Sequence, residues 1–331
     1  MTVYLEEPWL CMDNVDKFAE YISEIKYPLQ ALETPRKKEN ILNGILKLSE
    51  NHNNLFNDNK DEIKVDLERL VSMKTKCLYR QWQKEIKGKK RTLSIPNPEL
   101  EIILKKYVKN IILNLPTHKK AYGGEPGWST AKMIRMHTPI GSVLSCDIYH
   151  AFESVKSDFV FEFYYNIAAK YFSEEISKDT AGFLTTISTV DYHNRDNSAF
   201  RNYYNNALPQ GSPVSMALFN RMLYPIDIEL EKLCQKNKLQ YSRWVDDIII
   251  TSPILQKDNS MMTIVLATLR ENYAIPVHKV FFQNKAPFYI LGQDIKDEVI
   301  LKSQNNIAKN ARQSVEEYYY NTSNINRLIN A

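Results

Sequence analysis

Cysteine, glycine and long apolar runs are scarce in this chain. Only four of its 331 residues are cysteines, and Cys11, Cys77, Cys146 and Cys234 show no Cys-X-X-Cys pair and no Cys/His ligand spacing. This pattern indicates neither a zinc site nor a disulfide framework, so we expect reduced, mostly buried thiols. No apolar run approaches the roughly 20 residues that span a bilayer, and the N-terminal segment carries acids where a signal peptide carries bases. We therefore expect a cytoplasmic protein without membrane contact.

The net charge is small, but the basic residues are unevenly distributed. The chain has 43 Lys and Arg against 39 Asp and Glu, which gives a net charge of +4. Residues 74–120 contain 13 basic residues against three acids, whereas the remainder carries 30 basic and 36 acidic groups. A basic face on an otherwise mildly acidic protein is typical of binding to a phosphate backbone, although a solvated Lys-rich surface would have the same composition.

The order of the expected elements favours a mixed α+β fold. Periodic apolar patterns predict helices within residues 1–73 and at 100–115, 156–188, 214–233, 260–275 and 303–331. Strands are expected at 77–86 and 91–96 around a basic turn, at 142–149, in a hairpin at 241–253 and in a strand pair at 288–295. Three of the nine glycines fall within AYGGEPGWST, which predicts tight turns or a close approach of the backbone there.

Three carboxylates are candidates for a metal site. Asp147 ends an apolar strand, and Asp246 and Asp247 lie at the tip of a predicted hairpin. Nucleotidyl transfer needs two divalent metals about 4 Å apart, held by carboxylates from separate strands, and hard oxygen ligands suit Mg²⁺. An Asp-Asp pair also arises by chance in a chain of this length, and each acid could be a turn cap or a surface residue. The acids alone therefore leave the chemistry open.

The neighbouring motifs resemble those of the reverse transcriptases. The resemblance runs from about Gln83 to Gly292, in the family's order. KEIKGKKRTLSIP resembles the fingers hairpin, DIYHAFESV the strand with the first metal aspartate, LPQGSPVS the turn beside the nucleotide pocket, WVDD the Tyr-X-Asp-Asp hairpin, HKVFF the lysine-bearing motif and YILGQDI the primer grip. AYGGEPGWSTAKMIRMH also resembles a segment that small bacterial enzymes carry between fingers and palm.

This resemblance implies a right-hand polymerase fold with fingers and palm, an N-terminal helical extension and a short helical thumb. The extension would comprise residues 1–73, the fingers 74–140, the palm 141–292 and the reduced thumb or tail 293–331. Because few residues follow Gly292, we expect a weak grip on a duplex, low processivity and no tethered nuclease or maturase domain.

The resemblance also implies a role for each residue of the metal site. Asp147 and Asp246 would ligate two Mg²⁺ ions, which Mn²⁺ could replace, with help from the Ile148 carbonyl. Asp247 would lie beside them in the metal site and add negative charge. Lys279 matches a lysine proposed to donate a proton to the departing pyrophosphate, although exposed lysines on strands are common.

Five residues would contact the incoming nucleotide. Phe152 matches an aromatic gate against the ribose 2′-hydroxyl, which predicts a preference for deoxynucleotides, while an ordinary core Phe is the alternative. Gln210 would contact the sugar, and Gly211 would let the template or nucleotide approach the backbone. Arg91 would clamp the triphosphate through its planar fork, and Lys84, on the opposite hairpin arm, is a weaker candidate for the same task.

The sequence departs from the family in several places. Trp244 replaces the usual tyrosine before the Asp pair, which puts the fit of the primer end in question. Residues 133–136 lack the Asn-Ala pattern of retron enzymes and the tail lacks Val-Thr-Gly, so a typical retron enzyme is disfavoured. In its small size, the chain resembles bacterial reverse transcriptases associated with abortive infection and antiphage defence.

The sequence therefore predicts an RNA-directed DNA polymerase that uses an RNA template and deoxynucleoside triphosphates to make a DNA product. A dedicated noncoding RNA, a partner protein or a second copy of the chain are the expected partners. Template-independent or protein-primed DNA synthesis on the same site stays open. An RNA-dependent RNA polymerase is disfavoured by Phe152, and an inactive nucleic-acid-binding scaffold is disfavoured because it has no need for adjacent, mutually repelling acids.

Overall fold

The chain forms two compact units in this computed structural model. The structure describes residues 34–50, 60–71, 78–86, 89–190, 206–257, 267, 277–296 and 299–302. The helical unit comprises Met1–Thr117 and His150–Met222, and the sheet unit comprises His118–Tyr149 and Leu223–Ala331. Each unit thus combines two separate stretches of the sequence. The assignment of fingers, palm and thumb to residue ranges stays a prediction.

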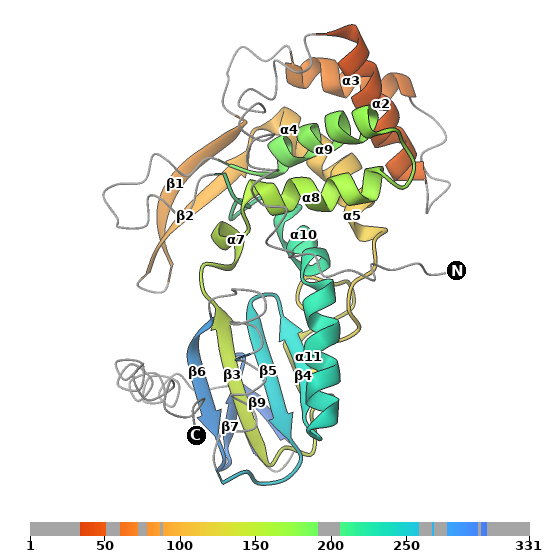
Figure 1. The fold of residues 1–331 in the computed structure, drawn as a ribbon. Helices are drawn as coiled ribbons and strands as arrows, with labels where there is room; N and C mark the ends of the chain where they lie inside the picture. The colour runs from red at the N-terminus through yellow and green to blue at the C-terminus, as the bar shows by residue number, and fades with distance from the viewer. Residues whose placement is uncertain are drawn as a thin grey trace. The chain divides into compact units, whose positions relative to one another are not determined.

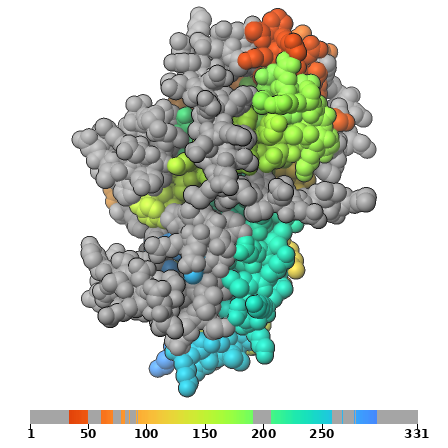
Figure 2. Space-filling view, in the orientation of Figure 1, coloured from red at the N-terminus to blue at the C-terminus, as the bar shows by residue number. Residues whose placement is uncertain are grey.

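The helical unit consists of packed helices with a two-stranded hairpin that extends from one side of them (Figure 1). Its elements are α2 (Pro35–Glu50), α3 (Lys60–Val71), β1 (Tyr79–Ile86), β2 (Lys89–Pro96), α4 (Pro98–Ile103), the π-helical turn η4 (Leu104–Val108), α5 (Lys109–Leu113), α7 (Ala151–Ser154), α8 (Ser157–Ala168), α9 (Glu174–Ser188) and α10 (Ser215–Met222). Helix α9 packs against both α8 and α2. The outer face of the α8–α9 pair lies at the surface, shown in green in Figure 2.

The predicted basic hairpin is confirmed by strands β1 and β2. They pair antiparallel from Tyr79 opposite Pro96 to Ile86 opposite Lys89, and the turn residues 87–88 lie outside the described residues. The Tyr79 hydroxyl donates to the Ile187 carbonyl of α9 over 2.7 Å, which fixes the base of the hairpin to the helices.

The predicted helix after the hairpin is confirmed, with one irregular turn. Asn97 caps it, because its side chain accepts a hydrogen bond from the Leu100 amide at 2.9 Å, and Pro98 follows where a missing N–H costs nothing. The ladder then widens to a π turn, in which the Lys109 N–H donates to the Leu104 carbonyl. Each of the three helical pieces contributes buried apolar residues, so one face of the stretch lies against the core on both sides of the irregular turn.

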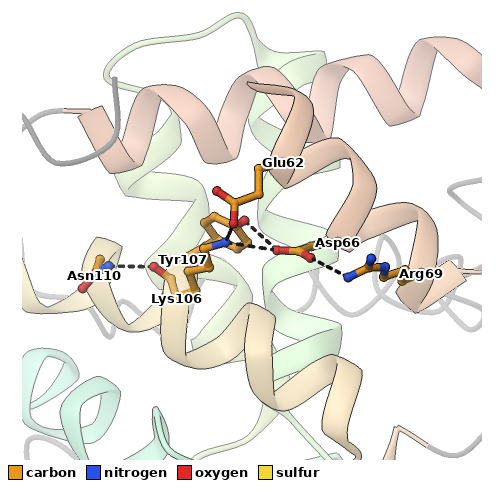
Figure 3. Close-up of polar contacts among 6 residues, drawn as sticks. All are labelled: Glu62, Asp66, Arg69, Lys106, Tyr107 and Asn110. Carbon is orange, nitrogen blue, oxygen red and sulfur yellow. Dashed lines mark hydrogen bonds and ion pairs between the residues drawn. The ribbon is translucent and has the colours of Figure 1, made fainter. Parts of the chain in front are cut away.

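A polar cluster joins α3 to η4 (Figure 3). The Lys106 ammonium pairs with Glu62 and lies 3.5 Å from Asp66, and the buried Tyr107 hydroxyl donates to Asp66 at 2.8 Å. Burial and the hydrogen bond to Asp66 raise the pKa of Tyr107 to about 12, so this phenol stays protonated and remains a donor. The cluster anchors part of the expected N-terminal extension to the helix after the hairpin.

Close packing of α2 on α9 requires a glycine. A Cβ on Gly44 would lie 2.6 Å from Cγ2 of Thr180 and closer still to its hydroxyl oxygen. Helix α2 can approach α9 only because this position carries no side chain. By contrast, a Cβ on Gly182, two residues further along α9, would meet only a ring carbon of Phe161, at 4.0 Å.

We therefore expect Gly44→Ala to lower the free energy of unfolding by about 1–3 kcal/mol through overpacking. Gly182→Ala is the matched control and should leave it unchanged or raise it by up to about 1 kcal/mol, since alanine favours helix. Urea unfolding followed by circular dichroism measures both. Equal effects of the two substitutions would contradict the packing described.

The sheet unit is built on a four-stranded antiparallel sheet (Figure 1). Its elements are α6 (Thr130–Arg135), β3 (Ser142–Ile148), α11 (Tyr224–Lys236), β4 (Gln240–Trp244), β5 (Asp247–Ser252), β6 (Val277–Gln283), β7 (Phe288–Ile290), β8 (Gln293–Lys296) and β9 (Val299–Lys302). The strand order is β4-β5-β3-β6, and β7, β8 and β9 form a second sheet. The predicted hairpin at 241–253 and the predicted strand pair at 288–295 are both confirmed.

Strand β3 lies inside the sheet, paired with β5 on one edge and with β6 on the other. Its even-numbered residues, which share one face, are all buried, whereas on the other face Val143 is buried and Ser145 and Asp147 are partly exposed. Val143 packs with Ile249 of β5, with Met133 and Ile134 of α6, and with residues of β7 and β8 in one buried cluster. This rigid centre ends at Asp147.

His137 joins two strands of this sheet from inside the core. Its ring nitrogens lie 2.7 Å from the Thr251 hydroxyl and 2.6 Å from the Ser242 hydroxyl, and the residue is 2% exposed. Burial, followed by the charge of Lys120, lowers the pKa of His137 to about 4. The ring is therefore neutral near pH 7, with one nitrogen donating and the other accepting.

The lowered pKa of His137 predicts that the folded protein loses stability in mild acid. An unfolded histidine titrates near pH 6.5, so between about pH 6.5 and pH 4 the unfolded state binds the proton more readily than the folded state. The His137 contribution is complete above that range, and we expect a loss of about 2 kcal/mol between pH 7.5 and pH 5. Urea unfolding of the native protein and of His137→Gln at both pH values isolates the contribution of His137 to the free energy of unfolding. Identical pH dependence in the two proteins would refute the prediction.

Two long helices expected from the sequence are each two helices. The stretch 156–188 breaks between α8 and α9, where Ser173 has extended backbone angles, and the stretch 214–233 breaks at Leu223, before Pro225 in the first turn of α11. Cys146 and Cys234 are buried free thiols, as expected. No helix within the described ranges is long and apolar enough to cross a bilayer. Cys11, Cys77, most of the first 73 residues and the expected helices at 260–275 and 303–331 lie outside the described residues, apart from residue 267.

Candidate active site

The three predicted metal-site aspartates lie at one end of the sheet unit. Asp147, the penultimate residue of β3, faces Asp247, the first residue of β5, in the antiparallel register. Asp246 precedes it in the loop between β4 and β5, and its carbonyl accepts a hydrogen bond from the Ile148 amide at 2.8 Å. Two neighbouring strands thus bring together acids that are far apart in the sequence.

Mutual repulsion and burial determine the electrostatics of this site. Burial first, then a hydrogen bond with Asp147 and the charges of Asp147 and Asp246, raise the pKa of Asp247 well above its usual range. Lys279 acts in the opposite direction. Burial and the neighbouring acids therefore favour the protonated form of Asp247 in the metal-free protein, which can donate a hydrogen bond to Asp147.

Lys279 is brought to the same place by an irregularity in β6. The register between β3 and β6 shifts between Ser145 and Asp147, and Lys279 has a φ of 50°, in the left-handed region. Such bulges redirect a side chain. The Lys279 ammonium forms an ion pair with the Asp147 carboxylate, and the two side chains are 43% and 24% exposed.

The donor set of this site fits a divalent cation. Within the described ranges, no three His, Cys, Asp or Glu side chains are already arranged to hold a metal ion. A hydrogen bond joins Asp147 to Asp247 at the β3–β5 end, and an ion pair joins Asp147 to Lys279. A divalent cation would supply the positive charge that the proton and the ammonium supply here, and carboxylate oxygens are the ligands that Mg²⁺ prefers.

The residues predicted to contact a nucleotide all belong to the helical unit. Phe152, at the start of α7, is half-buried and packs against Phe219 of α10, with ring centroids 5.6 Å apart. The Gln210 side-chain amide donates to both carboxylate oxygens of Glu153, at 3.1 and 3.3 Å. Glu153 is 3% exposed. This contact fixes the side-chain amide nitrogen of Gln210. The side-chain carbonyl oxygen takes no part in it.

Strand β2 connects the remaining predicted residues. Lys84 of β1 faces Arg91 of β2 in the hairpin register, and the Arg91 side chain is exposed. Three residues further along β2, the backbone amide of Ser94 donates to the backbone carbonyl of Gln210 at 2.7 Å. Gly211 has a φ of 113°, and a Cβ there would lie 3.1 Å from the Ser94 carbonyl oxygen. The close backbone approach expected at Gly211 is thus made by β2, and contact with a nucleotide stays a prediction.

Several residues of the site were missed by sequence reasoning. Glu153 follows Phe152 directly, and its contact with Gln210 joins distant segments without any periodic signal. Arg243 and Asp227 form a fully buried ion pair beneath the Asp246 loop. An arginine within the predicted hairpin could have drawn attention to Arg243, but its partner on α11 could not have been identified from the sequence.

Comparison with known proteins agrees with these motifs. Residues 80–295, more than half of the chain, match the family described as reverse transcriptase (RNA-dependent DNA polymerase). A retron Mx162 reverse transcriptase of Myxococcus xanthus is 26% identical over 167 residues, which are 49% of this chain and 33% of the relative. A retron Ec86 reverse transcriptase of Escherichia coli is 24% identical over 209 residues, which are 62% of this chain and 59% of the relative. This chain therefore spans only part of the length of these two relatives.

Among solved structures, the chain is similar to telomerases. The apo telomerase of Candida tropicalis, truncated from its C-terminal domain, gives a TM-score of 0.46 at 15% identity and covers 68% of this chain and 55% of that one. Telomerase of Candida albicans with a fragment of telomeric RNA gives 0.43 at 12% identity, with 68% and 45% covered. The family match carries the conclusion on fold, and the mixed helix and sheet content agrees with the predicted right-hand polymerase fold. On its sequence match and the motifs within it, this chain belongs to the reverse transcriptase family.

Proposed function

We propose that this protein is an RNA-directed DNA polymerase whose active site lies at the β3–β5 end of the sheet unit. The observation that carries the proposal is the pairing of Asp147 with Asp247 on neighbouring strands, with Asp246 adjacent. Membership of the reverse transcriptase family supports the reaction type. Holding repelling carboxylates together costs stability, and a cation-dependent reaction gives a reason for that cost.

Asp147, Asp246 and the Ile148 carbonyl would hold the metal ions, with Asp247 beside them. Two Mg²⁺ ions bound there, or Mn²⁺ in their place, would supply the positive charge needed to activate the primer 3′-hydroxyl and to neutralise the triphosphate. Lys279, ion-paired with Asp147 in this structure, would exchange that partner for the departing pyrophosphate and donate a proton to it.

The helical unit would position the nucleotide. Arg91, with Lys84 facing it across the hairpin, would bind the triphosphate through charge-assisted hydrogen bonds. Gln210, anchored on Glu153, would present its carbonyl oxygen to the sugar. Phe152, supported by Phe219, would exclude a ribose 2′-hydroxyl.

The relatives suggest a biological setting. Both relatives described above are retron reverse transcriptases, which favours a retron-like enzyme. The missing Asn-Ala and Val-Thr-Gly patterns had counted against this placement. We propose an RNA template supplied by a dedicated noncoding RNA, a short DNA product and a role in antiphage defence. A partner protein or a second copy of the chain would contribute to binding of the nucleic acid.

The direct test is incorporation of labelled deoxynucleotides, with Mg²⁺ or Mn²⁺, by protein purified with its co-isolating nucleic acid. We expect the Asp246→Asn, Asp247→Asn double variant to lose at least roughly a thousand-fold in rate, because several kcal/mol of transition-state stabilisation disappear. The Glu174→Gln, Glu175→Gln variant removes two adjacent acids from the first turn of α9 and should retain activity.

The products of this assay also separate the alternatives. Sequencing the product identifies the template, while synthesis after nuclease treatment and without added template would indicate untemplated addition. Equal use of ribonucleotides would contradict the gate assigned to Phe152. Absence of product under every metal, primer and template condition would favour the inactive scaffold.

The contact between Glu153 and Gln210 gives a second prediction. We expect Glu153→Leu to raise KM for deoxynucleotides about tenfold with little change in kcat, because the sugar-binding amide loses its anchor. Gln210→Leu should have a similar effect, and the double variant should be no worse than either single variant. Fully additive losses would show that the two residues act independently.

A further inference from the structure

The loop that carries Asp246 has a strained backbone. Val245 and Asp246 form the two-residue connection between Trp244 of β4 and Asp247 of β5. Val245 has a φ of 56°, which is rare for a β-branched residue, and a glycine normally occupies such a position. A residue in this region costs of order 1–3 kcal/mol and persists only where its surroundings hold it. Contacts with neighbouring residues must therefore stabilise the left-handed backbone conformation of Val245.

One side of the loop is held by a buried arginine. The Arg243 Nη1 donates to the Val245 carbonyl at 2.6 Å, while its Nε and Nη2 donate to the two carboxylate oxygens of Asp227, at 2.8 and 2.7 Å. The Tyr241 hydroxyl donates to the same carboxylate at 2.5 Å. Arg243 and Asp227 are each 1% exposed. Helix α11, which carries Asp227, thus fixes the guanidinium that contacts the loop.

The other side of the loop is held by the segment 120–123. The Arg243 amide donates to the Lys120 carbonyl at 2.8 Å, and the Tyr122 amide donates to the Arg243 carbonyl at 2.9 Å, so this segment extends the sheet beside β4. At its end, a Cβ on Gly123 would lie 2.6 Å from Cγ2 of Val245 and closer still to its backbone nitrogen. Only glycine allows this contact, which accounts for one of the glycines clustered in this part of the sequence.

The guanidinium fork is suited to this task in two respects. Arginine has donors on three nitrogens in a rigid plane, so it can bind both oxygens of Asp227 and still reach the Val245 carbonyl. Its charge is neutralised by Asp227, so it adds no net positive charge beside carboxylates that would have to bind a cation. A lysine offers one nitrogen and could not maintain all three contacts.

We propose that Arg243 is a positioning residue of the candidate active site, which together with Gly123 holds the Val245 turn and thereby orients Asp246 and Asp247. The inference rests on the proposed function for its catalytic meaning. Its structural part, the dependence of the turn on Arg243, can be tested separately.

The main variant removes the whole buried cluster. Asp227→Leu, Tyr241→Phe and Arg243→Met together avoid the unpaired buried charge that a single substitution would leave, and such apolar replacements are often neutral for folding. Arg221→Met is the matched control, because Arg221 is also buried, at 5% exposure, and donates to a backbone carbonyl, that of Ile112 in the helical unit, at 3.0 Å. Arg243→Lys retains the charge without the fork.

Hydrogen exchange at Ile148 reports on the turn directly, since its amide donates to the Asp246 carbonyl. We expect this amide to exchange at least about tenfold faster in the triple variant, relative to other amides of β3, and to be unchanged in Arg221→Met. Arg243→Lys should resemble the triple variant. Unaltered protection of Ile148 in a folded triple variant would overturn the proposal.

Binding of Mn²⁺, followed by electron paramagnetic resonance of the free ion, reports on the carboxylates. We expect the dissociation constant to rise about tenfold in the triple variant, with a matching rise in the metal concentration for half-maximal activity and no change in KM for deoxynucleotides. Gly123→Ala should weaken Mn²⁺ binding too, whereas Gly182→Ala should not.

The two readouts separate failure of the inference from failure of the proposed function. If the native protein binds no Mn²⁺, the proposed metal chemistry fails, and Ile148 exchange still decides whether Arg243 holds the turn. If the native protein binds Mn²⁺ and the triple variant binds it equally well, Arg243 does not position the carboxylates.

Discussion

The antiparallel pairing of β3 with β5 brings Asp147 opposite Asp247, and the close approach of two acids that would repel each other when both are ionised is the constraint that the contacts around them offset. Strand β3, which is buried along the whole of one face, and the buried cluster around Val143 supply a rigid base for these acids. Lys279 reaches Asp147 through a bulge in β6 and offsets part of the repulsion. In this account, Asp147 and Asp246 would hold divalent cations, which would supply the positive charge that the proton and the Lys279 ammonium supply here.

The two units have different roles in the proposed reaction. The sheet unit concentrates negative charge for metal ions, whereas the helical unit supplies donors and an aromatic ring for the nucleotide. In both units, a buried ion or carboxylate fixes a polar group that would otherwise be mobile. Asp227 fixes the Arg243 fork, and Glu153 fixes the Gln210 amide. Positioning of this kind limits the reorganisation needed when substrates bind.

Local signals predicted much of the fold, and contacts between distant segments account for what was missed. Alternation and turn residues identified the hairpin β1–β2 and the hairpin that carries Asp246, because both patterns lie within a few residues. The breaks before Ser173 and at Leu223 were not anticipated, since apolar periodicity continues across them. The acids of the site were found through the motif series, while Glu153 and Arg243 were not, because their partners lie on other elements. The glycine cluster predicted a close backbone approach, which Gly123 makes, but its partner Val245 could not be identified from the sequence. The functional roles of the site residues stay predictions.

The central claim is that the carboxylates at the β3–β5 end bind divalent metal. Crystals soaked in Mn²⁺ and measured at the manganese absorption edge test it most directly. The account predicts anomalous density between Asp147 and Asp246, with Lys279 displaced from its ion pair with Asp147. Density only at other acids, or none in crystals where the carboxylates are accessible to solvent, would contradict it.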